Sequence, residues 1–147
     1  LTPNGPRVIE YNARFGDPET QVVLPRLKTD LVDIIVACAD GTLDQLDIQW
    51  SEETAACVVM ASGGYPGSYQ KGIEIHGLNE NGQVDGATVF HAGTVKKDGK
   101  FYTNGGRVLG VTAMGKDLED ALAKAYAAVK TIQFDGAHYR KDIGKVR

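Results

Sequence analysis

The sequence predicts an α+β fold in which a small antiparallel sheet carries one covering helix. Three observations lead to this prediction. After residue 54 the chain consists of short β-like runs separated by turns that are rich in glycine and asparagine. One amphipathic helical pattern follows these runs, and two helix start signals precede them.

The first 25 residues predict one strand and one short helix. Residues 7–12 have the composition of a strand, and an Asn-Gly turn flanked by prolines precedes them. Because this turn would normally join two strands, we expect the sequence to begin inside a sheet. In the helix that follows, Asp17 is expected to cap and Pro18 suits the first helical position. Glu19 complements the positive end of the helix dipole, and Pro25 ends or bends the helix.

A second helix is predicted from Asp30 to Gly41. Asp30 is a capping residue and Gly41 is a typical stop signal. Apolar residues between them recur at helical spacing: Leu31, Ile34, Ile35 and Cys38. The polar, mixed stretch of residues 42–53 predicts a linker.

The rest of the chain predicts strands, turns and one closing helix. The apolar run 55–61 has the length of a buried strand, and the glycine-rich residues 62–67 predict a loop. Further strands are expected over residues 72–76, 87–91, 93–96 and 107–113. The last helix is capped by Asp117 and has one apolar face, made of Leu118, Ala121, Leu122, Ala125, Val129 and Ile132.

The composition excludes several classes of protein. A net charge of −3 argues against a dedicated nucleic-acid binder. No apolar run is long enough to cross a membrane, and no signal-peptide pattern is present. Cys38 and Cys57 are surrounded by apolar residues and are expected to be buried, reduced thiols of a cytoplasmic protein.

The polar side chains of the first predicted strand form a candidate metal site. On a strand, Glu10 and Asn12 would share one face, with Cα atoms about 7 Å apart. A carboxylate and an amide carbonyl are ligands that Mg²⁺ accepts together with substrate phosphates. Arg14 would continue the same face and could hold a carboxylate or phosphoryl group. The alternative is that all three residues form the solvated face of an edge strand, with Asp17 and Glu19 serving only the helix start.

Five collinear blocks of the sequence resemble one enzyme family. Glu10-x-Asn12-x-Arg14 is similar to the metal-binding strand of the ATP-grasp superfamily, and the longer run 8–21 resembles the version found in phosphoribosylamine–glycine ligases. The other similar blocks are residues 58–67, 89–94, 103–109 and 139–144. This resemblance extends over essentially the whole chain. It implies that residues 1–48 end an ATP-grasp domain and that residues 49–147 form the small C-terminal domain of the ligase.

The resemblance also implies an activity and a set of roles. The family joins glycine to 5-phosphoribosylamine with ATP, through glycyl phosphate, in purine biosynthesis. Glu10 and Asn12 would bind Mg²⁺ or Mn²⁺, and Arg14 would stabilise charge on the acyl phosphate. Asp17 and Glu19 would face the amine substrates. The partners would be these small molecules, without nucleic acid or membrane, in a monomeric cytoplasmic parent enzyme.

Two other functions fit the residues. One is a non-catalytic binding module that keeps the α+β domain, and the other is an ATP-grasp ligase that acts on another carboxylate. The nucleotide-clasping strands of an ATP-grasp enzyme would precede residue 1, so we expect the chain alone to be inactive. The loop 63–67 lacks the lysine and the following helix of a P-loop and is expected to be a plain turn.

Overall fold

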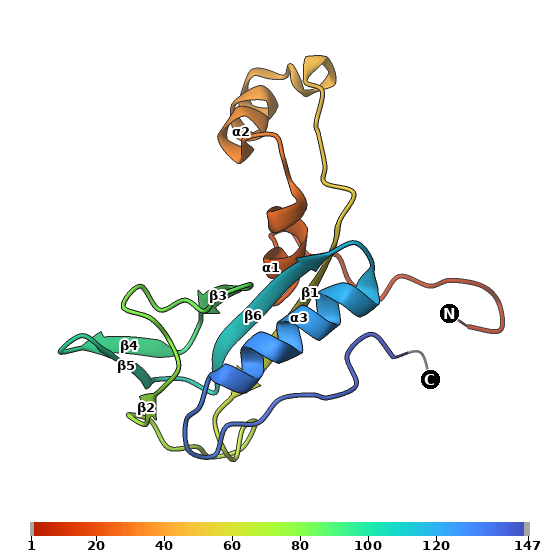
Figure 1. Cartoon of the computed structure of the whole chain (residues 1–147). Coiled ribbons are helices and arrows are strands. Elements are labelled where there is room, and N and C mark those ends of the chain that lie inside the picture. Colours follow the sequence, from red (N-terminus) through yellow and green to blue (C-terminus); the bar gives the residue numbers. More distant parts are fainter. Residues whose placement is uncertain (1, 146–147) are drawn as a thin grey trace.

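The computed structural model describes residues 2–145 and contains two three-stranded antiparallel sheets. The first sheet has the order β1-β6-β3, with β1 at Thr54–Ala61, β6 at Arg107–Gly115 and β3 at Thr88–His91. The second has the order β2-β5-β4, with β2 at Glu74–Ile75, β5 at Lys100–Thr103 and β4 at Thr94–Lys97. Helix α3, Leu118–Thr131, lies across the first sheet (Figure 1). The predicted α+β fold with a covering helix is confirmed.

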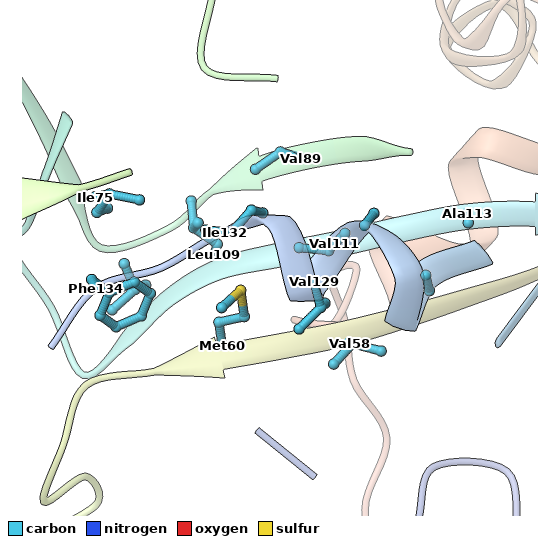
Figure 2. Packing of buried hydrophobic residues seen from close by; sticks show 13 residues of the cluster. Val58, Met60, Ile75, Val89, Leu109, Val111, Ala113, Val129, Ile132 and Phe134 are labelled. Atoms are coloured by element: carbon cyan, nitrogen blue, oxygen red, sulfur yellow. The ribbon is translucent and has the colours of Figure 1, made fainter. Parts of the chain in front are cut away.

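The hydrophobic core lies between α3 and the two long strands of the first sheet (Figure 2). Val58 of β1 pairs with Val111 of β6, and Met60 pairs with Leu109, so these four side chains point to the same face. The helix contributes buried alanines and one valine to this contact: Ala121, Ala125, Ala128 and Val129. Small side chains allow the helix to lie close to the sheet, where the interior packs at high density.

The cap that the sequence predicts at the start of α3 is present, but the buried apolar face of this helix is narrower than expected. The Asp117 carboxylate accepts a hydrogen bond from the Asp120 amide at 2.8 Å. Leu118, predicted on the buried face, is 43% exposed, and like Leu122 it lies beside Gly144 of the C-terminal segment. Ile132 is buried but follows the last helical residue as its C-cap.

A short helix covers the other face of the first sheet. This is α1, Thr20–Val23, which continues into the 3-10 turn η1, Leu24–Arg26, and contacts β1 and β6. Gly110 of β6 makes room for it, because a Cβ atom there would lie 3.2 Å from Cys57 Sγ and 3.9 Å from Gln21 Cγ. The first sheet is therefore covered on both faces, by α3 and by α1.

Residues 28–49 form an arm that extends away from both sheets (Figure 1). The arm contains α2, Leu31–Asp40, and the 3-10 turn η2, Leu43–Gln45. A β-bridge between Leu27 and Trp50 closes its base. The predicted start and stop of α2 are confirmed, since Asp30 accepts from the Val32 amide at 2.8 Å and Gly41 has a φ of 69°. No residue of α2 is fully buried, and only Leu31, Ile34 and Ala37 are half-buried, so the expected apolar face is covered only in part within the described residues 2–145.

Several predictions in the first 40 residues were wrong. Residues 7–12 form no strand, because no strand within the described part of the chain pairs with them. The first helix begins at Thr20 rather than at Asp17, whose carboxylate binds other side chains instead of capping. Cys38 is exposed on α2, whereas Cys57 is buried as expected.

Strand β5 was not predicted. It lies at Lys100–Thr103, between the glycine-containing stretches 98–99 and 104–106, and pairs with both β2 and β4. The neighbouring strand β2 is only two residues long, shorter than the predicted run 72–76.

Candidate functional site

The predicted metal and catalytic residues lie on an exposed segment without regular secondary structure. Glu10, Asn12 and Arg14 are all exposed, and Tyr11, which lies between Glu10 and Asn12, is 87% exposed. Arg14 donates a hydrogen bond from Nη1 to the Phe15 carbonyl at 3.0 Å. Glu10 and Asn12 form no hydrogen bond or ion pair with any side chain of residues 2–145, so their oxygen atoms are available to a ligand.

Asp17, by contrast, is held by two side chains from different elements. Arg107, at the start of β6, lies with Nη2 at 3.2 Å from Asp17 Oδ2, and its Nη1 donates to the Asp17 main-chain carbonyl at 3.0 Å. Gln21 of α1 donates from Nε2 to Asp17 Oδ1 at 2.8 Å. Both carboxylate oxygens therefore have partners, and a substrate amine would have to displace one of them.

Glu19 lies directly over Gly16. A Cβ atom on Gly16 would be 1.6 Å from Glu19 Oε2, so only glycine fits beneath this carboxylate in its present position. Gly16 is also the only buried residue among residues 2–20, and its carbonyl accepts a hydrogen bond from the Thr20 amide at 3.0 Å. This contact places Glu19 at the start of α1, next to Asp17.

Buried polar groups lie beneath α1. Burial raises the pKa of the Cys57 thiol, the neighbouring Thr112 hydroxyl lowers it, and the charge of Asp17 raises it further. Gln21 Oε1 is buried in the same region and has no hydrogen-bond partner among the described residues. The thiol is consequently a poor nucleophile, and we assign it no catalytic step.

The glycine-rich loop 63–67 is fixed by packing. Ser62, which precedes the loop, is buried. Its amide donates to the Gly106 carbonyl and its Oγ donates to the Gly105 carbonyl, both at 2.8 Å. The ring of Tyr65 lies against Gly106, where a Cβ atom would be 2.2 Å from Tyr65 Cδ2. These contacts explain the loop as a turn that packs on the residues before β6.

Sequence reasoning missed Arg107 as a member of this site. It was noted only inside the family-like block 103–109, and no spacing signal connects it to Asp17. No group of three or more histidine, cysteine or acidic side chains among residues 2–145 could bind a metal ion by itself. No helix in the same range is long and apolar enough to cross a membrane.

Comparisons with known proteins identify similar chains. The family profile described as "Phosphoribosylglycinamide synthetase, C domain" matches residues 55–146. The phosphoribosylamine–glycine ligase of Synechocystis is 58% identical over 146 residues, which are 98% of this chain and 35% of that protein. The human trifunctional purine biosynthetic protein adenosine-3 is 54% identical over 98% of this chain and 14% of its own length.

A solved structure is similar along nearly the whole chain. The crystal structure of phosphoribosylamine–glycine ligase from Thermotoga maritima superposes with a TM-score of 0.81 at 36% identity, over 97% of this chain and 34% of that one. The present chain thus spans about a third of the length of the single-function ligases that it matches.

Proposed function

The chain belongs to the phosphoribosylglycinamide synthetase family, and we propose that it forms the carboxy-terminal third of an ATP-dependent phosphoribosylamine–glycine ligase. The observation that carries this proposal is the similarity to ligases, which extends over 98% of the chain and therefore includes both the Glu10–Arg14 segment and the C domain. The activity belongs to the longer protein, and the cytoplasm is its expected compartment.

The distribution of exposed apolar side chains supports a domain division near residue 48. Large exposed apolar residues are concentrated before β1: Val8, Ile9, Tyr11, Phe15, Val23, Val32, Ile35, Val36, Leu43 and Trp50. After residue 50 only Tyr69 and Leu118 are of this kind within the described chain. We therefore propose that residues 1–48 complete an ATP-grasp domain, whose remainder covers these side chains, and that residues 49–147 form the C-terminal domain.

The donor atoms of the exposed segment fit a magnesium or manganese ion. Glu10 and Asn12 offer hard oxygen ligands without competing partners, and Mg²⁺ commonly takes one or two protein ligands together with substrate phosphates. A bound Mg²⁺ would neutralise charge on the phosphates of ATP. Arg14 offers a guanidinium two residues further along, which suits an acyl phosphate.

The proposed reaction has two steps. A carboxylate oxygen of glycine attacks the γ-phosphorus of ATP, the bond to the bridging oxygen breaks, and ADP leaves. The amine of 5-phosphoribosylamine then attacks the carbonyl carbon of glycyl phosphate, phosphate leaves, and the nitrogen loses a proton. Both steps require positioning and charge stabilisation rather than a protein nucleophile, and Arg14 would stabilise the negative charge.

A chimeric ligase tests the proposal. This chain replaces the matching third of the Synechocystis relative, and ADP formation is measured with glycine, 5-phosphoribosylamine, ATP and magnesium. We expect turnover to depend on both glycine and the amine, whereas the 147-residue chain alone gives none. A folded chimera that binds ATP but forms no glycinamide ribonucleotide would contradict the proposal.

A further inference from the structure

Arg107 connects two parts of the chain that are far apart in sequence. Its guanidinium binds the main-chain carbonyl of Asp17 through Nη1 and lies next to the carboxylate with Nη2. The two residues are 90 positions apart. Arg107 is the first residue of β6, the central strand of the first sheet, and pairs with Ala61 of β1. The arginine therefore extends from the central strand of a sheet, while Asp17 follows the exposed segment.

The form of the contact suits arginine in particular. Two nitrogens of one planar group bind two different oxygens, one from the main chain and one from the side chain of Asp17. A lysine ammonium carries the same charge but lacks this planar fork. Gln21 holds the remaining carboxylate oxygen, so Asp17 is fixed from β6 and from α1 at once.

The contact contributes little to global stability. The side chains of Arg107 and Asp17 are 42% and 50% exposed, and ion pairs exposed to this degree typically contribute about 0–1 kcal/mol. What the contact does determine is where Asp17 lies relative to the first sheet. Asp17 follows Asn12 by five residues and Glu10 by seven, so fixing Asp17 restricts the positions that both side chains can reach.

We propose that Arg107 is a positioning residue of the ligase, which acts through Asp17 to hold the Glu10–Arg14 segment at a fixed place beside the C domain. This proposal rests on the proposed function of that segment. It assigns Asp17 an internal role: its carboxylate anchors the segment rather than binding the amine substrate.

Hydrogen exchange in the 147-residue chain tests the anchor without any assay of activity. In Arg107→Gln, the amides of Thr20 and Val23, which donate to the Gly16 and Glu19 carbonyls, should exchange about fivefold faster. Amides of β1 should be unchanged. Lys124→Gln is the matched control, since Lys124 also binds one carboxylate, of Asp120, and one main-chain carbonyl, of Met114.

Two results of this measurement would overturn the proposal. One is unchanged exchange at Thr20 and Val23 in Arg107→Gln. The other is a fall in the melting temperature of Arg107→Gln by more than about 4 °C, equivalent to more than about 1 kcal/mol for a chain of this size, because Arg107 would then support the fold as a whole. Asp17→Asn, which keeps the main-chain contact, should loosen the same amides by a smaller factor.

Magnesium dependence of the chimeric ligase tests the consequence for catalysis. In Arg107→Gln the magnesium concentration for half-maximal rate should rise about tenfold, with the rate at saturating magnesium nearly recovered. Arg107→Lys should lie between wild type and Arg107→Gln, and Lys124→Gln should match wild type. An unchanged magnesium requirement in Arg107→Gln would refute the positioning role. Failure of the proposed function would differ, because the unsubstituted chimera would itself be inactive.

Discussion

Replacing Gly77 by alanine should destabilise the chain strongly, because it disturbs the junction between the second sheet and the end of α3. Gly77 follows β2 and has a φ of 87°, and a Cβ atom there would lie 1.9 Å from the Thr131 carbonyl oxygen. The adjacent His76 and Gln133 exchange two main-chain hydrogen bonds, at 2.8 and 3.0 Å, so the backbone has little freedom to move.

The expected magnitude follows from two separate costs. A left-handed backbone at a residue with a Cβ atom costs about 1–2 kcal/mol. Overpacking against the Thr131 carbonyl adds about 1–3 kcal/mol. Since each kcal/mol lowers the melting temperature of a chain of this size by about 2–4 °C, Gly77→Ala should melt about 10 °C below wild type.

Gly99→Ala separates the two costs. Gly99 has a similar φ of 77° in the turn between β4 and β5, but a Cβ atom there would meet no heavy atom within 4 Å. Only the backbone cost applies, and it is partly offset by the lower entropy of the unfolded chain, so the melting temperature should fall by about 3 °C. Thermal unfolding followed by circular dichroism measures both variants. Equal losses at the two glycines would refute the steric argument.

Three further predictions concern Arg14 and the two cysteines. In the chimeric ligase, Arg14→Lys should lower kcat by about 100- to 1,000-fold with nearly unchanged ATP affinity and melting temperature; unaltered kcat in steady-state kinetics would remove Arg14 from the site. Iodoacetamide should alkylate exposed Cys38 rapidly and buried Cys57 only on unfolding, as peptide mass spectrometry can show. Burial raises the pKa of the Cys57 thiol. The stabilising effect of the buried, protonated thiol is therefore complete below the ordinary thiol pKa and decreases as pH rises above it. The difference in unfolding free energy between wild type and Cys57→Ala should therefore be smaller at alkaline pH than at neutral pH. A larger difference at alkaline pH would contradict this sign.

Capped helices and long apolar strands could be predicted from the sequence. The Asp117 and Asp30 caps and the Gly41 stop act through neighbouring residues, so local sequence is enough to place α2 and α3. Strands depend on partners elsewhere in the chain. The run 7–12 has a strand-like composition but no partner strand among residues 2–145, and β5 is short, begins with an exposed lysine and is defined by pairing on both sides.

The candidate site shows the same limit. The oxygen donors Glu10 and Asn12 were identified from their residue types and spacing, and their role as metal ligands stays a prediction. The contact between Arg107 and Asp17 joins residues 90 positions apart, and no local pattern could have indicated it. Asp17 and Pro18 resembled a helix start because their composition suits one, but the ion pair with Arg107 holds the Asp17 carboxylate in a different role.

The central claim is that this chain supplies the magnesium ligands of a glycine ligase. A magnesium titration of Glu10→Gln in the chimeric enzyme tests this claim most directly. Glu52→Gln, at an exposed glutamate outside the Glu10–Arg14 segment, is the control and should behave as wild type. Glu10→Gln should lower turnover at least about a hundredfold, or about 2.7 kcal/mol of barrier, and raised magnesium should recover part of the loss. Turnover within about threefold of wild type at ordinary magnesium, less than about 0.7 kcal/mol, would show that Glu10 binds no catalytic metal.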